Sequence, residues 1–278
     1  MIHKKLLFFI YRKIAKIYIL IFGRKKMQFF NDLILSLSLK GKGYMNYGTF
    51  KETGEKFFIN LIKEEINLSL DIGANVGDYT KMLLSDTKSK VVSFEPLPKA
   101  FEELEKIKSN FQNRLEIHNV AIGIKNEFLD LSYGTEKSEK ASLMSNLEKL
   151  SFIKDQNNKK ISVQVRQLDY FENYFKDKVI DFIKIDTEGF EYEVLKGSKN
   201  ILNTHKPKFI QIEFNWHQLI KNQTLYNLSK LINFSDVFKI LPHGNKLMHI
   251  DPFRPENNIY HLSNYVFIRK DISNKYKA

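Results

Sequence analysis

A strand, a glycine turn, a helix and a second strand follow one another between residues 68 and 96, and this unit restricts the fold more than any other part of the chain. Residues 68–72 are an apolar run of strand length, and a helix opens over residues 76–84. Residues 91–94 are a second run of buried-strand type. Because a strand, a helix and a strand in this order build parallel sheets, the unit predicts a doubly wound α/β fold.

The turn between the first strand and its helix has the composition of a ligand site. Small residues at Gly73, Asn75 and Gly77 let the backbone approach a ligand, and the helix that follows offers unpaired N–H groups at its start. Glu95 ends the second strand, 24 residues after Asp71, where an acid can accept both hydroxyls of a ribose. The unit therefore predicts a site for an adenosine-containing molecule.

Two cofactors use this geometry, NAD and S-adenosylmethionine, and the acids of the turn distinguish them. The dinucleotide fingerprint G-x-G-x-x-G has a third glycine, whereas the corresponding positions here read Gly73, Asn75 and Asp78. Asp71 and Asp78 repel a diphosphate and suit the ammonium and sulfonium groups of a methyl donor. We therefore expect S-adenosylmethionine, with NAD(P) and a packed turn without a ligand as the alternatives.

The rest of the chain continues the alternation of strands and helices. Strands are predicted at residues 115–122, 127–133, 161–168, 179–185, 209–214, 237–241, 247–250 and 265–269, and helices at residues 54–66, 98–110, 192–203 and 225–232. Residues 136–158 are polar and rich in lysine, and we expect them to form a mobile flap over the site. The segment GKGYMNYG, residues 41–48, divides a helical extension (residues 1–48) from the main domain (residues 49–278).

The extension holds most of the positive charge. Residues 1–45 carry ten Lys or Arg and one acid, a net charge of +9 out of the total of +12. On a helix, seven apolar residues fall on one stripe: Leu6, Leu7, Ile10, Ile14, Ile17, Tyr18 and Ile21. Four basic residues fall opposite: Lys5, Arg12, Lys13 and Lys16. No apolar run approaches the ~20 residues of a membrane span.

A basic amphipathic helix of this kind has two main interpretations. Residues 1–26 could lie on an anionic membrane surface, or they could dock on the domain or form an oligomer contact. Nucleic acid is a third alternative, and the small net charge of the remaining chain, +3, argues against it. With no cysteine in the chain, we expect a cytoplasmic protein, peripheral at most on the inner face of a membrane.

Six motifs occur in order over roughly residues 54–215. They are DIGANVGDYT, SFEPLPKAFEEL, NVAIG, QLDYF, DFIKIDTEGFEYEVLKG and KFIQIEFN. Together they resemble the FkbM family of S-adenosylmethionine-dependent methyltransferases, whose members typically methylate hydroxyl groups on sugars and natural products. The resemblance implies a class I methyltransferase (Rossmann-like) fold, with a mostly parallel doubly wound sheet and a C-terminal antiparallel strand. Its most specific piece is the K-I-D-x-E-G-x-E signature from Lys184 to Glu191.

The resemblance also implies that eight residues contact the donor. They are Asp71, Gly73, Asn75, Gly77, Glu95, Leu97, Asn119 and Ala121. The glycine turn would lie under the methionine portion, with Asp71 near the ammonium group. Glu95 matches the acid that binds ribose, Leu97 would lie against adenine, and Asn119 to Ala121 match the adenine edge.

Catalytic candidates stand where the fourth strand ends, because ligands of open α/β sheets lie at the carboxyl ends of the strands. Alternation along the strand points Lys184 and Asp186 the same way. Asp186 is the first candidate for a base or an acceptor-orienting group, and binding of the donor ammonium is its alternative role. Lys184 either neutralises Asp186 or polarises the acceptor oxygen. Glu188 either joins the site or caps the next helix.

Glu213 and His217 follow the next strand, on the rim where an acceptor would enter. A histidine of near-neutral pKa can serve as a base, although a lone histidine is often structural. Asp169, Asp186, Glu213 and His217 could also supply ligands for magnesium or manganese. Nothing in their spacing demands a metal, so we expect none.

These observations predict an O-methyltransferase that acts on a hydroxyl group of a small molecule or glycan, with a sugar or lipid-linked glycan as the expected acceptor. Methylation of the 2′-hydroxyl of RNA is an alternative, and it predicts salt-sensitive RNA binding. A membrane-associated scaffold that has the fold without activity is the alternative from another class of protein. The oligomeric state stays open.

Overall fold

The protein is described by a computed structural model that covers residues 2–135, 141–144, 158–244 and 247–277. The chain divides into two compact units, residues 1–42 and residues 43–278. The predicted flap, residues 136–158, lies outside the described residues apart from positions 141–144 and 158.

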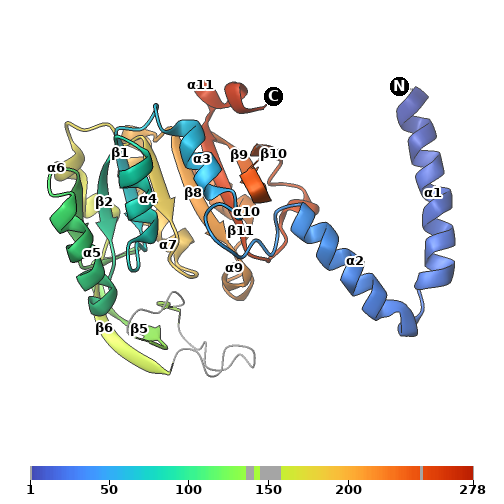
Figure 1. Cartoon of the computed structure of the whole chain (residues 1–278), viewed down its shortest axis with the longest axis horizontal. Coiled ribbons are helices and arrows are strands. Elements are labelled where there is room, and N and C mark those ends of the chain that lie inside the picture. The colour runs from blue at the N-terminus through green and yellow to red at the C-terminus, as the bar shows by residue number, and fades with distance from the viewer. Residues whose placement is uncertain (1, 136–140, 145–157, 245–246, 278) are drawn as a thin grey trace. The chain divides into compact units, whose positions relative to one another are not determined.

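The larger unit is built on one eight-stranded sheet (Figure 1). Its strand order is β10-β9-β11-β8-β7-β1-β2-β3. The five parallel strands are β1 (Leu68–Ile72), β2 (Lys90–Phe94), β3 (Leu115–His118), β7 (Phe182–Ile185) and β8 (Phe209–Phe214). The other three are β9 (Ser235–Ile240), β10 (Leu247–Ile250) and β11 (Ser263–Arg269), and β11 runs antiparallel between β8 and β9. The order and the antiparallel β11 confirm the class I methyltransferase fold with a C-terminal antiparallel strand.

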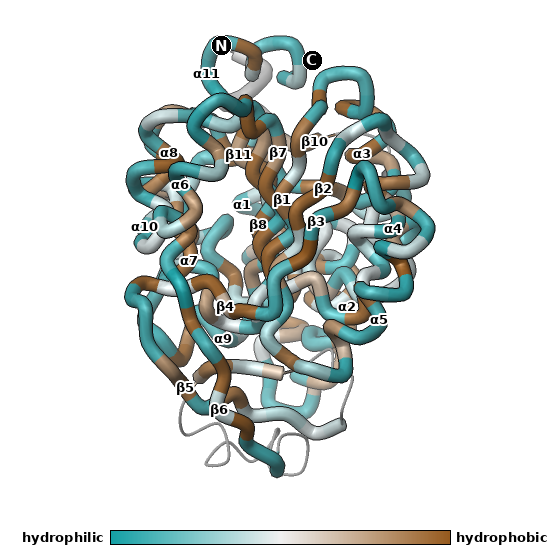
Figure 2. Tube along the Cα trace, turned by 90° about the vertical axis from the view of Figure 1, so that its left-hand side faces the viewer, coloured by the Kyte–Doolittle hydropathy of each residue, from teal (hydrophilic) through white to brown (hydrophobic). Residues whose placement is uncertain are grey.

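Helices cover both faces of this sheet, as the edge-on view in Figure 2 shows. One face carries α3 (Glu55–Ile62), α4 (Asp78–Asp86) and α5 (Pro98–Asn110). The other carries α6 (Glu172–Phe175), α7 (Glu191–Lys196), α8 (Lys199–His205) and α10 (Leu225–Leu231). Alternation along each strand sends apolar side chains to both layers: Ile183 and Ile185 of β7 enter one core cluster, and Phe182 enters the other.

A second, three-stranded sheet lies beyond the carboxyl ends of the parallel strands (Figure 2). It consists of β4 (Ala121–Ile122), β6 (Lys159–Arg166) and β5 (Glu127–Tyr133), in that order. β6 pairs parallel with β4 and antiparallel with β5. This small sheet flanks the edge at which a ligand is expected.

Two predicted elements are broken in the structure. The strand predicted at residues 115–122 is wrong as a single strand, because β3 pairs with β2 while β4 leaves to pair with β6. The helix predicted at residues 192–203 is two helices, α7 and α8, and Gly197 lies between them. A Cβ at Gly197 would lie 1.8 Å from the carbonyl oxygen of Gly123, so the close approach of that loop requires glycine there.

The smaller unit consists of α1 (Ile2–Phe22), a 3₁₀ turn η1 (Lys25–Met27) and α2 (Gln28–Gly41). Within the described residues, no helix combines the length and the apolarity that crossing a bilayer requires. The predicted N-terminal helix is therefore present, and a second helix follows it.

Candidate functional site

The glycine turn is shaped by the approach of β7 to β1. Gly73 has a φ of 85°, and a Cβ on it would lie 1.8 Å from the carbonyl oxygen of Asp186. Gly77 has a φ of 89°, and a Cβ there would meet side-chain atoms of Leu104 and Ile107 of α5 within 2.7 Å. Asn75, with a φ of 47°, completes a turn in left-handed conformations that a ligand can approach closely.

Glu95 holds the turn from the end of β2. Its two carboxylate oxygens accept hydrogen bonds from the backbone N–H groups of Asn75 (2.8 Å) and Leu97 (2.7 Å). Burial raises the pKa of Glu95 to about 7, although these two N–H groups oppose the shift. The carboxylate is thus positioned before any ligand arrives, and each oxygen keeps a lone pair that a ribose hydroxyl can use.

A pocket opens between the glycine turn and the small sheet. Six of the predicted site residues line it: Gly73, Asn75, Glu95, Ala121, Asp186 and Glu188. Seven further residues complete its wall: Phe94, Pro96, Ile122, Leu131, Ala141, Leu143 and Thr187. Donor-side and acceptor-side candidates therefore meet in one cavity.

These seven wall residues are not among the contacts predicted from the sequence. Phe94, Pro96, Ile122 and Thr187 are chain neighbours of predicted contacts, and no motif marks them as contacts in their own right. Leu131, Ala141 and Leu143 come from β5 and from the segment expected to be a polar flap. The short apolar run ASLM, residues 141–144, was the signal for them.

The other predicted donor contacts do not line the pocket. Asp71 is buried and accepts a hydrogen bond from the Thr80 hydroxyl at 2.6 Å. Leu97 packs in a buried cluster with Ala100, and only its N–H reaches Glu95. Asn119 donates from Nδ2 to the carbonyl oxygen of Glu95 at 2.8 Å. Leu97 and Asn119 therefore hold Glu95, which itself lines the pocket.

A buried row of polar residues crosses four strands beneath the pocket. Strand register places Ser93, Asp71, Lys184 and Gln211 side by side on β2, β1, β7 and β8. Helices α3 and α4 close the row, because Glu55 accepts a hydrogen bond from Gln211 Nε2 (2.7 Å) and the Tyr79 hydroxyl donates to Gln211 Oε1 (2.7 Å). The row satisfies polar groups that would otherwise be costly inside a sheet.

Lys184 is the cation of this row. Its Nζ donates to Asp186 Oδ2 at 2.7 Å and lies 4.8 Å from the centre of the Tyr79 ring. Burial alone would lower its pKa, but the carboxylates of Asp186, Glu55 and Asp71 outweigh burial and raise it. Burial in turn raises the pKa of Asp71 to about 6 against the pull of Lys184. Lys184 is therefore charged, and the prediction that it faces Asp186 is confirmed by this contact.

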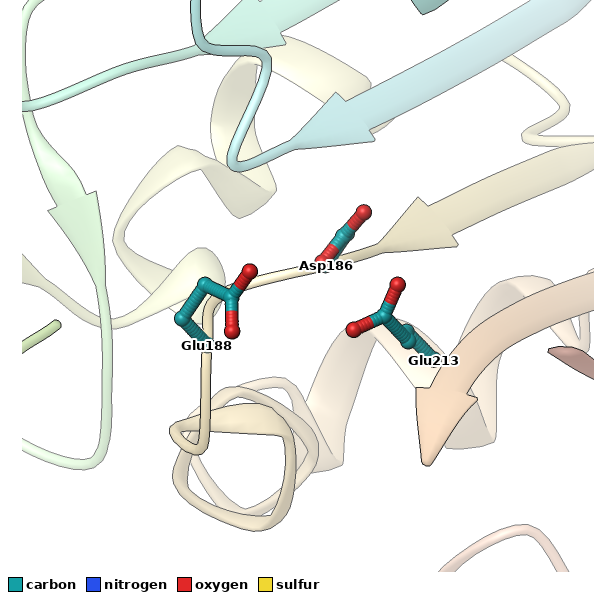
Figure 3. A group of neighbouring side chains, drawn as sticks. All are labelled: Asp186, Glu188 and Glu213. Carbon is teal, nitrogen blue, oxygen red and sulfur yellow. The ribbon is translucent and has the colours of Figure 1, made fainter. Parts of the chain in front are cut away.

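Three carboxylates gather where β7 and β8 end (Figure 3). Oxygens of Asp186, Glu188 and Glu213 lie within 4.8 Å of one another. Burial, and then repulsion by the other two acids, raises the pKa of Glu213 well above its usual range. The environment of Glu213 therefore favours its protonated form, which can donate a hydrogen bond.

Glu188 does not cap the helix that follows it. Its own φ is 51°, and its side chain turns toward Asp186 and Glu213. Glu191 binds the backbone of this loop instead, because its Oε1 accepts hydrogen bonds from the N–H groups of Thr187 (2.9 Å) and Gly189 (3.1 Å). The buried Glu191 carboxylate thus fixes the loop that presents Glu188.

His217 is buried beside the carboxylates. Its Nδ1 faces Asn215 Oδ1, which also accepts from the His217 N–H, so Nδ1 carries the proton in this arrangement. Burial lowers the pKa of His217 to about 3, which leaves the ring neutral and weakly basic. Its Nδ1 lies 3.5 Å from Glu188 Oε2. These contacts favour a positioning role for His217 over that of a base.

The pocket has the features that S-adenosylmethionine would need. Asn75 Oδ1 is buried and accepts no hydrogen bond from the described residues, so it is open to a donor group of a ligand. Glu95 can hold the ribose, and Phe94, Leu131 and Leu143 give the apolar wall that adenine requires. The described residues therefore fit this cofactor.

The three carboxylates of Asp186, Glu188 and Glu213 could supply hard oxygen ligands to a divalent cation. This group differs from the metal set considered from the sequence. Asp169 accepts from the N–H groups of Asn200 and Ile201 at the start of α8, and His217 turns its Nδ1 to Asn215. Only Asp186 and Glu213 of that earlier set belong to the group.

Comparison with known proteins identifies a matching family, related sequences and similar solved structures. The sequence model of the methyltransferase FkbM domain matches residues 71–244. The chain is 27% identical over 175 residues to the 2-O-methyltransferase NoeI of Sinorhizobium fredii, across 59% of this chain and 70% of that protein. It is 28% identical over 149 residues to Methyltransferase 1 of Beauveria bassiana, across 46% of this chain and 57% of that protein. An rRNA methylase structure from Streptococcus thermophilus aligns with a TM-score of 0.40 at 11% identity, across 77% of this chain and 93% of that one.

Proposed function

The chain belongs to the FkbM family of methyltransferases, with S-adenosylmethionine as its methyl donor, and from this premise we propose that it methylates a hydroxyl group of a sugar or glycan. The observation that carries the proposal is the group of Asp186, Glu188 and Glu213, of which Asp186 and Glu188 line the donor pocket. Carboxylates in such a group can accept hydrogen bonds from neighbouring hydroxyls of a sugar. The name of the relative NoeI, a 2-O-methyltransferase, supports transfer to oxygen.

The donor side of the pocket binds S-adenosylmethionine and orients its methyl group. The bound donor supplies an electrophilic methyl group on a sulfonium centre. Glu95 accepts the ribose hydroxyls, and Asn75 offers its Oδ1 to a hydrogen-bond donor of the ligand. Gly73 lets the turn lie against the carbonyl of Asp186, so the donor and the catalytic carboxylate are held by adjoining strands. Positioning of this kind can supply up to ~7–11 kcal/mol of the barrier reduction.

Asp186 is the proposed base. Lys184 fixes its Oδ2 at 2.7 Å, which leaves Oδ1 to accept the proton of the acceptor hydroxyl. Glu213, whose pKa is raised by burial, can in its protonated form donate a hydrogen bond to a second acceptor oxygen. Glu188 can accept from a vicinal hydroxyl. The three groups together orient a polyol and take up one proton.

The same carboxylates disfavour RNA as the acceptor, because a polyanion would approach three acids within 4.8 Å of one another. Methylation of RNA is one of the results that the following acceptor experiment can distinguish. The experiment incubates the full chain and labelled donor with panels of sugars, glycans and RNA. Methylation of RNA alone would refute the proposal, and donor binding without turnover on any acceptor would favour a scaffold.

Asp186→Asn tests the role of the proposed base. We expect turnover to fall by ~10²–10⁴-fold, the range for a placed base, while donor affinity stays close to that of the parent. Asp177→Asn is the matched control, since Asp177 is exposed and does not line the pocket. Equal losses of turnover and donor affinity would assign Asp186 to the donor ammonium instead.

A further inference from the structure

The smaller unit exposes an unusual amount of apolar surface. On α1, exposed residues face all sides of the helix, so the surface is broader than the single stripe predicted from the sequence. They are Phe8, Phe9, Ile10, Tyr11, Ile14, Ile17, Tyr18, Ile19, Leu20 and Ile21. On α2, the exposed set is Phe29, Phe30, Leu33, Ile34, Leu35 and Leu37. Many exposed large apolar side chains on two successive helices mark an interaction site.

The corner between the two helices is built by specific contacts. The Tyr18 hydroxyl donates to Asn31 Oδ1 at 2.5 Å, and Asn31 Nδ2 donates to the carbonyl oxygen of Phe22 at the end of α1. The rings of Phe22 and Phe30 stack with their centroids 5.0 Å apart. These contacts fix the connection between α1 and α2, so the apolar residues of both helices belong to one folded unit.

Basic residues accompany this apolar surface. Two groups of three cations lie near the apolar residues. Arg24, Lys25 and Lys26 lie together at the corner, and Arg12, Lys13 and Lys16 lie among the apolar residues of α1. Residues 1–45 carry a net charge of +9, which leaves +3 for the rest of the chain. The partner of this surface must therefore offer an apolar interior and negative charge at the same time.

We propose that the two helices, residues 8–41, dock on the surface of an anionic lipid bilayer. The acyl chains take up the apolar side chains, and the lipid headgroups pair with the corner cations. Self-association would bring two units of net charge +9 together, and the charge repulsion disfavours it. The surface includes α2, which extends it beyond residues 1–26, the segment expected from the sequence.

The test measures co-sedimentation of the full chain with phosphatidylcholine vesicles, with and without phosphatidylglycerol. We expect binding only with the anionic lipid, and less of it at high salt. Substituting Arg24, Lys25 and Lys26 together by Gln should lower partitioning by on the order of 100-fold, from about fivefold per charge. Leu33→Asp with Leu37→Asp should abolish it, because both side chains are at least half exposed and face the proposed bilayer.

Matched controls separate this effect from general charge. A second triple variant removes three exposed lysines of the larger unit by substitution with Gln: Lys81, Lys88 and Lys199. It should bind vesicles like the parent, and every variant should keep donor binding. Three results would overturn the proposal. The full chain could fail to bind anionic vesicles, or both triple variants could lose binding equally. Sedimentation velocity without lipid could also show an oligomer that Leu33→Asp dissociates.

Discussion

The donor site makes its sharpest prediction at Glu95. Glu95→Gln keeps the shape of the side chain but removes its charge and replaces one oxygen by an NH₂ group. Both oxygens now accept backbone N–H groups, at 2.8 Å from Asn75 and 2.7 Å from Leu97. The new NH₂ group must face one of these N–H groups, so one hydrogen bond is lost together with an acceptor for the ribose.

The expected loss of donor affinity follows from these contacts. Hydrogen bonds to a charged group contribute roughly 1.5–3 kcal/mol each, so we expect the donor to bind about 10–150-fold more weakly. The sign of the pH effect follows from the raised pKa of Glu95, about 7 against the usual 4.5. Ribose hydroxyls favour the ionised carboxylate, so donor affinity should rise by about tenfold between pH 6 and pH 8 in the parent.

The same carboxyl affects the stability of the ligand-free protein. A raised folded-state pKa contributes stability that is present below pH 4.5 and lost as the pH rises through about 7. The shift corresponds to roughly 3 kcal/mol in the free energy of unfolding. Glu95→Gln should flatten this part of the pH dependence, which urea unfolding of the two proteins at several pH values can measure.

Calorimetry with S-adenosylhomocysteine at about pH 6 and pH 8 is the assay for donor affinity. Glu102→Gln is the control, because Glu102 lies exposed on α5 in an ion pair with Lys99 and should change nothing. If the parent binds equally at both pH values, the assigned pKa of Glu95 is wrong. If Glu95→Gln binds as tightly as the parent, Glu95 does not hold the ribose.

Three more predictions concern the rest of the site. Lys184→Met should lower the free energy of unfolding by roughly 3–5 kcal/mol in urea unfolding, because it leaves buried carboxylates without their cation; an unchanged midpoint would contradict the buried row. Gly73→Ala should abolish donor binding in calorimetry, since its Cβ would lie 1.8 Å from the Asp186 carbonyl oxygen, whereas Gly41→Ala, with nothing within 4 Å, should bind like the parent. Turnover should survive EDTA, because Lys184 already supplies a cation to Asp186; a loss that magnesium restores would place a metal at the three carboxylates.

The donor turn was predictable because its residues are contiguous. A strand, Gly73, a helix and Glu95 stand in one stretch, so spacing alone brought them to one edge of the sheet. Helix α5, strand β8 and strand β10 also have the predicted bounds at both ends. The local sequence pattern does not predict an element whose pairing depends on a partner far along the chain. Strands β3 and β4 are separate because Ala121 pairs with Val165, 44 residues later in the chain.

The buried polar row was missed for the same reason. Glu55 looks like a solvated residue at the start of a helix, yet it is 6% exposed and bonded to Gln211, 156 residues away. One signal was present: Glu55, Phe58, Ile59 and Ile62 share the helical i, i+3, i+4, i+7 spacing of a buried face. A carboxylate on such a face needs an internal partner, and Lys184 and Gln211 supply it.

The position of β7 links the donor to the acceptor. Asp71 and Lys184 are register partners on β1 and β7, and the strand ends touch again where Gly73 meets the Asp186 carbonyl. A change in the end of β7 would therefore disturb donor binding and the proposed base together. Glu188 follows β7 in a loop and Glu213 belongs to β8, so neither residue is a register partner of β1. Acceptor specificity in this chain should accordingly reside in the Glu188 loop, Glu213 and α9 (Trp216–Ile220), where substitutions can alter the acceptor without moving the donor.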